Sequence, residues 1–377
     1  MKTQRVDMFV SPMGTPSDVS GLQKLADAGK IRPDTLVALV GKTEGTGQHD
    51  DWGRVWADVA LREWTAKFLS IPVADVAQRV IFVLSGGCPG VITPHIAAVT
   101  REMVEVDQPS DEKRLVVGRA GSEPMAPEDV GRMGQIHKVA EATRRAMQDA
   151  GLTDPKDVHL VMVKVPGLTV ASIRDAESRG ETVVSHDLTF GPEGAGSYAN
   201  DAAALGVALA LGEVKESSLS DGVVRRKWEL YSEVAMTSSG GEKRHGEVVV
   251  FGNAAGAQSP LRIGHAVTQD FIDAQGVRNA LQSAGIHFNG GLPDEKDMAD
   301  RLVHVFAKSV IPGSDQVRGQ RITLLDDVDA YQIGKALGGM LIASVTGRTT
   351  NYVSGGERNS HQGPPGGNIV AAVVRVT

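Results

Sequence analysis

The sequence predicts an α/β protein in which three homologous sheet-and-helix repeats surround a pseudo-threefold axis. Two recurring strand endings lead to this prediction. Three apolar segments each end in a lysine, at Lys42, Lys164 and Lys308. Three later apolar segments, 81–87, 235–241 and 351–356, each end in serine followed by glycine. Short apolar runs that stop at polar residues are typical of buried strands, and a pattern that occurs three times indicates an internal repeat.

The distance from lysine to serine is similar in two of the three copies. Ser85, Ser238 and Ser354 follow their lysines by 43, 74 and 46 residues. The middle copy is longer because it holds inserted loops around 182–196 and 213–227. The three copies therefore share one arrangement of strands despite this difference in length.

Each copy is expected to contribute two helices. The first helices precede the lysine strands at 18–28, 127–150 and 270–284, and the second follow them at 55–69, 199–211 and 330–345. Gly29, Gly151 and Gly285 follow the first helices and are expected to adopt the left-handed conformation that ends a helix. Each unit reads strand–helix–strand–helix–strand, with an extra strand at 247–251 or 368–376. Polar segments containing glycine or proline near 109–113 and 254–260 divide the chain into units 1–108, 109–255 and 256–377.

Composition excludes several classes of partner. Acidic residues outnumber basic ones, 46 to 39, and no basic cluster is present, so nucleic acid is not expected. The single cysteine, Cys88, excludes an internal disulfide framework and Cys-rich metal sites. No apolar run approaches the roughly 20 residues that span a bilayer, and the N-terminal residues lack the apolar segment of a signal peptide. We therefore expect a cytoplasmic protein with no membrane partner.

If the three units are equivalent, their lysines and serines converge at the axis around one small cavity. A lysine becomes a general base when burial and neighbouring cations lower its pKa, and it can then activate a serine hydroxyl. Backbone N–H groups near Gly86 and Gly355 suit a carbonyl oxygen that becomes negatively charged. Alternatively, each Ser-Gly pair marks a turn and the lysines are solvated; three matching copies favour the chemical interpretation.

Other motifs do not indicate a cofactor. Gly41-Lys42-Thr43 is no P-loop, because the required earlier glycine is Leu36. Cys88 has no recognisable histidine partner, so we interpret it as a small buried residue rather than a nucleophile. The histidines lack the spacing of a catalytic metal site.

At these residues the sequence resembles the cyclic amide hydrolases, cyanuric acid hydrolase and barbiturase, over nearly the whole chain. The segments that carry the resemblance are 41–45, 85–87, 93–95, 204–208, 317–321 and 361–364. The resemblance implies the Toblerone-like fold of that family, with the substrate ring on the threefold axis. It also implies amide hydrolysis by a Ser-Lys dyad, with the middle pair reacting, and a homotetramer in at least some members.

Carried over by position, the resemblance implies three dyads and assigns the reaction to one of them. The dyads are Lys42 with Ser85, Lys164 with Ser238, and Lys308 with Ser354. Lys164 is then the general base and Ser238 the nucleophile. Ser238 fits the family pattern better than Ser239, which is expected beside the substrate.

The ring-binding positions depart from the family pattern. Arg54 and Arg321 match two of its three arginines, whereas the third position is Asn200. This neutral residue makes a barbiturate-like or other less symmetric ring at least as well suited as cyanuric acid. Relatives also carry a glutamate that helps to bind a structural ion where this chain has Val310, and Asn368 replaces a glycine. We therefore expect no cofactor for catalysis and no structural Mg²⁺ or Ca²⁺.

The leading hypothesis is a ring-opening hydrolase of a cyclic amide or imide. The alternative from another class is a non-catalytic protein that binds a small molecule on the same fold. Asn200 favours this alternative, and the three intact dyads oppose it. A structural or assembly protein on the same fold is a third hypothesis.

Overall fold

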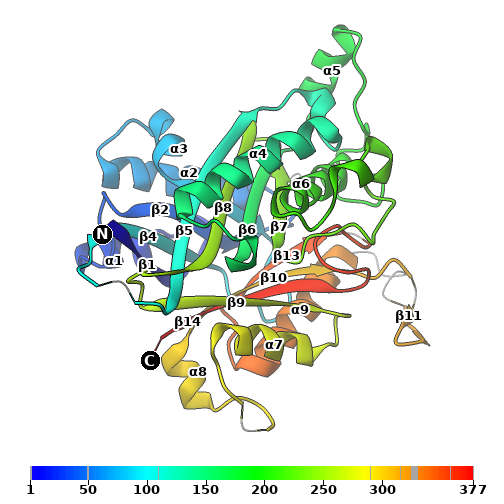
Figure 1. Cartoon of the computed structure of the whole chain (residues 1–377). Coiled ribbons are helices and arrows are strands. Elements are labelled where there is room, and N and C mark those ends of the chain that lie inside the picture. Colours follow the sequence, from blue (N-terminus) through cyan, green and yellow to red (C-terminus); the bar gives the residue numbers. More distant parts are fainter. Residues whose placement is uncertain are drawn as a thin grey trace.

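Three four-stranded sheets form the frame of the molecule, as the computed structural model shows (Figure 1). The structure describes residues 2–48, 51–108, 110–288, 290–314, 316–323, 330–356 and 358–376. The first sheet has the order β1 (Lys2–Pro12), β4 (His95–Glu105), β2 (Leu36–Thr43) and β3 (Ile81–Gly86). The second has the order β5 (Lys113–Pro124), β8 (His245–Ala255), β6 (Val158–Pro166) and β7 (Ala235–Gly240). The third has the order β9 (Leu261–Thr268), β14 (Asn368–Arg375), β10 (Leu302–Val310) and β13 (Tyr352–Gly356).

The three sheets share one topology. In each, the lysine strand lies between the last strand of the unit, with which it pairs antiparallel, and the serine strand, with which it pairs parallel. The register places Lys42 opposite Ser85, Lys164 opposite Ser238 and Lys308 opposite Ser354. The predicted fold class is confirmed.

Two helices of each unit lie in equivalent places of the chain. Those before the lysine strands are α1 (Ser20–Asp27), α4 (Met133–Ala150) and α7 (Ala274–Ala284). Those after the lysine strands are α2 (Trp52–Leu69), α6 (Ala195–Leu211) and α9 (Ala330–Thr346). The shorter elements are α3 (Val76–Arg79), α5 (Val170–Ser178), α8 (Glu295–Arg301), β11 (Gln316–Val317) and β12 (Gln320–Arg321). Gly29, Gly151 and Gly285 have positive φ angles, as predicted.

Several helix boundaries differ from those expected. The second helix begins at Trp52 rather than at residue 55, because the Asp51 carboxylate accepts the Arg54 backbone N–H at 3.0 Å and so caps the helix. The fourth helix begins at Met133 rather than at residue 127, because a 3₁₀ turn at Pro127–Asp129 precedes it. Pro109, at a predicted unit boundary, lies outside the described residues.

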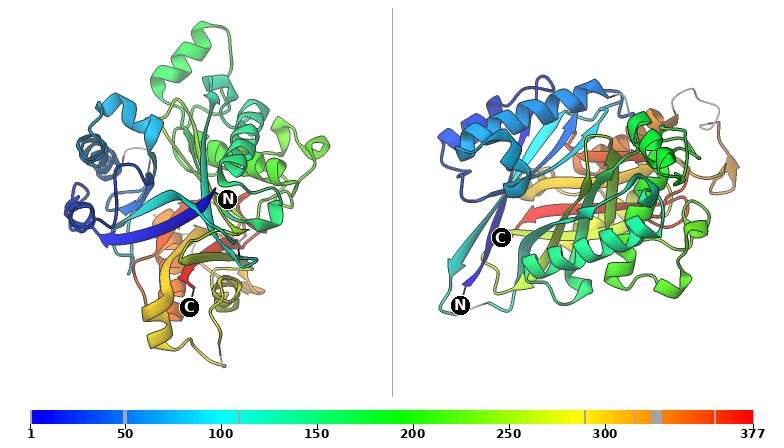
Figure 2. Two further views of the ribbon diagram at one scale, coloured as in Figure 1. Left: turned by 60° about the vertical axis from the view of Figure 1, so that its left-hand side comes forward. Right: turned by 90° about the horizontal axis from the view of Figure 1, so that it is seen from above.

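The sheets face one another at the centre, and the helices lie outside (Figure 2, left). One buried cluster joins residues of all three sheets. It contains the residues two before each lysine and each serine: Val40, Met162, Phe306, Val83, Met236 and Tyr352. Because alternate residues of a strand share a face, the lysines and serines point to the same central side as this cluster.

Candidate active site

Each predicted dyad is brought together by the pairing of two buried strands. Lys42 Nζ donates to Ser85 Oγ at 3.1 Å and to the Gly86 carbonyl at 2.9 Å. Lys308 Nζ donates to Ser354 Oγ at 3.5 Å. Lys164 Nζ donates to the Ser239 carbonyl at 2.7 Å, and its strand pairing places Ser238 opposite it.

All three lysines are buried, with at most 2% of each exposed. Burial lowers the pKa of Lys42 and Lys164 to about 8 and that of Lys308 to about 7. For Lys308, the Asp201 carboxylate opposes this shift and the charges of Lys42 and Lys164 add to it. A lysine with a pKa near 8 is partly neutral at physiological pH, as a general base must be.

Contacts between units show that the dyads converge. Lys308 Nζ of the third unit donates to the Thr237 carbonyl of the second at 3.2 Å, and Thr237 directly precedes Ser238. The buried Tyr352 hydroxyl of the third unit shares a hydrogen bond with Ser85 of the first. The three lysine–serine pairs therefore lie around one centre rather than in three separate sites.

The middle dyad differs from the other two. The Ser238 hydroxyl oxygen is buried and has no hydrogen-bond partner among the described residues. The neighbouring Ser239 hydroxyl donates to the Gly196 carbonyl of α6 at 3.3 Å, consistent with adjacent strand residues facing opposite sides. A buried hydroxyl without a partner needs an explanation, and a reactive group that contacts substrate provides one.

The first residues of α2, α6 and α9 carry polar side chains toward the junctions between units. Arg54 of α2 is 6% exposed, and its charge acts on Lys164 and Glu242 of the second unit. Asn200 of α6 is equally buried, and its side-chain oxygen has no partner among the described residues.

Lys335 of α9 is fully buried and was missed in the sequence analysis. Its Nζ donates to the Gly86 carbonyl of the first unit at 3.2 Å and lies 4.4 Å from the centre of the Tyr331 ring. A side chain at Gly355 would collide with the Lys335 methylene groups, so the glycine leaves room for this lysine. Lys335 is the single charged residue within 330–346, and this could have identified it from the sequence.

Asp201, next to Asn200, is a buried link between the second and third units. Its carboxylate accepts from Arg225 at 2.7 Å and from Ser360 at 2.5 Å. Although burial acts to raise it, the pKa of Asp201 is lowered, chiefly by the charge of Arg225. Nothing local in the sequence predicts this ion pair.

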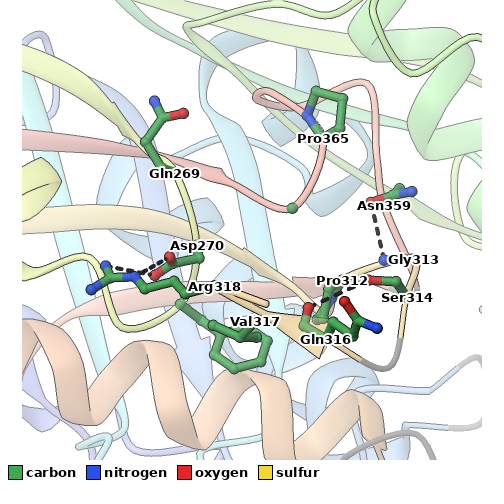
Figure 3. A pocket seen from close by; sticks show the side chains of 12 residues that line it. Gln269, Asp270, Pro312, Gly313, Ser314, Gln316, Val317, Arg318, Asn359 and Pro365 are labelled. Carbon is green, nitrogen blue, oxygen red and sulfur yellow. Dashed lines mark hydrogen bonds and ion pairs between the residues drawn. The ribbon is translucent and has the colours of Figure 1, made fainter. Parts of the chain in front are cut away.

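Arg321 is placed apart from the dyad contacts described above. It is exposed on β12, in a hairpin whose turn residue Arg318 forms an ion pair with Asp270 at 2.7 Å. A pocket of about 480 Å³ lies beside this hairpin, lined by Asp270, Arg318, Asn359 and Pro365 among others (Figure 3). No dyad residue lines this pocket, and a ring-binding role for Arg321 stays a prediction.

The residues at the family's expected ion position do not fit a divalent cation. Val310 supplies no carboxylate, and its backbone N–H donates to the side-chain oxygen of Asn368 at 2.7 Å. This hydrogen bond occupies the side-chain oxygen of Asn368, which could otherwise bind a metal ion. The described part of the chain contains no group of three or more His, Cys, Asp or Glu residues placed to hold an ion.

Comparisons with known proteins agree with the fold and identify the family. The model of the amidohydrolase ring-opening protein family matches residues 7–375. A cyclic amide hydrolase of Pseudofrankia inefficax is 50% identical over 98% of this chain and 95% of its own. Barbiturase 1 of a Nocardioides species is 43% identical over 96% of each chain. A solved cyanuric acid hydrolase structure is 38% identical, with a TM-score of 0.92 over 99% of this chain and all of its own. The chain belongs to the family of ring-opening amidohydrolases.

Proposed function

We propose that the protein opens the ring of a cyclic amide or imide, barbiturate- or cyanurate-like, at the middle Ser-Lys dyad. The observation that carries this proposal is the buried Ser238 hydroxyl, which has no hydrogen-bond partner among the described residues and lies opposite a lysine whose pKa is lowered by burial to about 8. Family membership supplies the reaction class, and the geometry favours Lys164 and Ser238 as the reacting pair.

The reaction proceeds in two steps. Neutral Lys164 accepts the proton of Ser238, whose Oγ attacks a ring carbonyl carbon. The ring C–N bond breaks, and the resulting ammonium group of Lys164 gives its proton to the leaving nitrogen. Water, deprotonated by Lys164, then attacks the carbonyl carbon of the serine ester. The bond between this carbon and Ser238 Oγ breaks, the ammonium group of Lys164 returns its proton to Oγ, and the ring-opened acid leaves. Overall, one cyclic amide and one water give one ring-opened acid, and the enzyme is regenerated.

The other two dyads hold the remaining carbonyls of the ring. Ser85 and Ser354 donate hydrogen bonds to these oxygens, with Lys42 and Lys308 behind them. Near the ring edges, Arg54 supplies a guanidinium group, Lys335 an amine, and Asn200 an amide that both donates and accepts. Lys335 is better placed than Arg321 for such a role, because it is buried at a junction between units.

The proposed substrate class follows from the different side chains that the site places near the three edges of the ring. A threefold-symmetric ring presents the same group to all three junctions, whereas this site offers two basic side chains and one neutral amide. An amide suits an edge that carries a neutral group or a substituent. A barbiturate-like or other less symmetric ring therefore matches the site at least as well as cyanuric acid.

A panel of cyclic ureides, imides and lactams tests the proposal. Purified protein is incubated with each compound, and ring-opened acid, heavier by one water, is sought by mass spectrometry. At least one compound is expected to be opened. Tight binding without any product across the panel would instead support the non-catalytic binder, which the neutral Asn200 favours.

We further propose that catalysis needs no metal or organic cofactor and that the chain assembles as a homo-oligomer, a tetramer by resemblance. Light scattering of the purified protein tests the assembly against the monomer mass of 39.8 kDa. Among the described residues, no helix is both long and apolar enough to cross a bilayer. A cytoplasmic location stays a prediction.

A further inference from the structure

The three dyads differ in the residue four positions after the serine. This residue is Pro89 in the first unit, Glu242 in the second and Arg358 in the third. At this position the middle dyad has a carboxylate; in the third unit a glutamate, Glu357, comes one residue earlier and lies outside the described residues. Glu242 Oε1 lies 3.4 Å from Lys164 Nζ. This ion pair joins the proposed base to a carboxylate.

The backbone between Ser238 and Glu242 is shaped to allow this contact. A Cβ atom at Gly240 would lie 2.1 Å from one Glu242 carboxylate oxygen and 2.3 Å from the other. Any side chain at this position would therefore displace the carboxylate. The glycine allows the chain to fold back, so that the carboxylate faces the buried amine.

The contacts of Lys164 differ from those of the other two lysines. Lys42 and Lys308 donate to the hydroxyl of their own serine, whereas Lys164 donates to the Ser239 carbonyl and contacts Glu242. The Ser238 hydroxyl is consequently left without a partner among the described residues. This arrangement keeps the amine in place while the nucleophile stays available to a substrate.

Charged groups from several elements face Lys164. Glu242 and Lys243 follow β7, Arg54 comes from α2, Lys308 from β10, and Glu247 is the register partner on β8. Glu247 forms its ion pair with Lys243 at 2.8 Å. Burial lowers the pKa of Lys164, Glu242 opposes that shift, and Arg54 and Lys243 reinforce it. The charges of Lys164 and Arg54 in turn outweigh burial and hold the pKa of Glu242 at about 2.

We propose that Glu242 is a positioning residue that acts through Lys164 and distinguishes the middle dyad as the reacting one. Its carboxylate holds the amine beside Ser238 and stabilises the ammonium group that forms when Lys164 takes the serine proton. Glu242 stays ionised throughout, and the proton passes from Ser238 to Lys164 and then to the leaving ring nitrogen. This inference rests on the proposed function.

The pH dependence of Glu242→Gln tests the inference. Activity needs neutral Lys164, so kcat/KM rises through the pKa of this amine. Without the carboxylate this rise is expected to move to lower pH by roughly one unit or more. Glu242→Asp keeps the charge at a longer distance, so it is expected to restore most of the profile and also provides a second variant if Glu242→Gln folds poorly. Glu193→Gln, an exposed acid paired with Arg226, is the matched control and should leave the profile unchanged.

A titration of the Lys164 amine by nitrogen NMR, in Ser238→Ala protein with labelled lysine, gives a readout that needs no turnover. Loss of the signal in Lys164→Arg identifies it. The pKa of Lys164 is expected to fall when Glu242→Gln is added. An unchanged pKa, together with an unchanged pH profile, would overturn the inference. Full turnover in Ser238→Ala would instead refute the proposed reacting pair, while the titration would still decide the role of Glu242.

Discussion

Replacing Asn200 by arginine should increase hydrolysis of cyanuric acid. Asn200 lies buried in α6, next to Asp201, which accepts a hydrogen bond from Ser360 of the third unit. The Asn200 side-chain oxygen has no partner among the described residues. An arginine there would add a charge-assisted hydrogen bond to one ring edge, worth roughly 1.5–3 kcal/mol. At ~1.4 kcal/mol per decade, this corresponds to a gain of about 10- to 100-fold in kcat/KM.

Asp201 should not neutralise the new charge. Its two oxygens already accept from Arg225 and from Ser360, and the His361 backbone N–H lies 3.3 Å from one of them. The larger side chain is expected to lower stability by about 1–3 kcal/mol through overpacking, which a thermal melt measures separately.

The assay compares kcat/KM for cyanuric acid and barbituric acid in the unmodified protein and in Asn200→Arg. Asn279→Arg adds the same charge on the exposed face of α7 and serves as the control. Weak or absent cyanuric acid hydrolysis is expected before the substitution. Efficient hydrolysis by the unmodified protein would refute the reasoning, since a basic side chain at position 200 would then be dispensable.

Three further predictions concern stability. Burial lowers the pKa of His95 to about 4 and that of its partner His304 well below the ordinary value, so the unfolded state binds protons first as pH falls below about 6.5. The free energy of unfolding, measured with urea at pH 7, 6 and 5, should therefore decline by up to about 1.4 kcal/mol per pH unit for each histidine. The decline should be smaller in a variant that carries both His95→Asn and His304→Asn. Asp201→Asn should cost about 3–5 kcal/mol, because it leaves the Arg225 charge buried and unpaired, whereas the exposed Asp175→Asn should cost little. Adding EDTA should change the melting temperature little; a large drop reversed by Mg²⁺ or Ca²⁺ would show that other groups bind an ion.

Much of the fold could be predicted from the sequence because the same strand endings, lysine or serine followed by glycine, occur in each of the three repeats. An apolar run that stops at Lys42 or Ser85 has few alternatives to a buried strand, and three copies fix one topology. Helix starts were less predictable, since a cap such as Asp51 shifts a boundary without changing the apolar pattern.

Some residues of the site could likewise be predicted from the sequence, and others could not. The dyads follow from strand register, a local property of each unit, and could be anticipated. The contacts of Lys335 with Gly86 and of Asp201 with Ser360 depend on how one unit meets another, because the partners are distant in sequence. Asp201 and Arg225 belong to one unit, but an inserted loop separates them along the chain. Glu242 lies close to Ser238 in the chain, but its contact with Lys164 depends on the fold of the loop at Gly240.

The most direct test of the account compares serine-to-alanine substitutions at the three dyads on a compound that the protein opens. Ser238→Ala should remove nearly all turnover while leaving the protein folded and able to bind ligand. Ser85→Ala and Ser354→Ala should mainly weaken binding, since each loses one carbonyl contact of about 1 kcal/mol. Loss of turnover in Ser85→Ala with activity retained in Ser238→Ala would contradict the assignment of the middle pair as the reacting dyad.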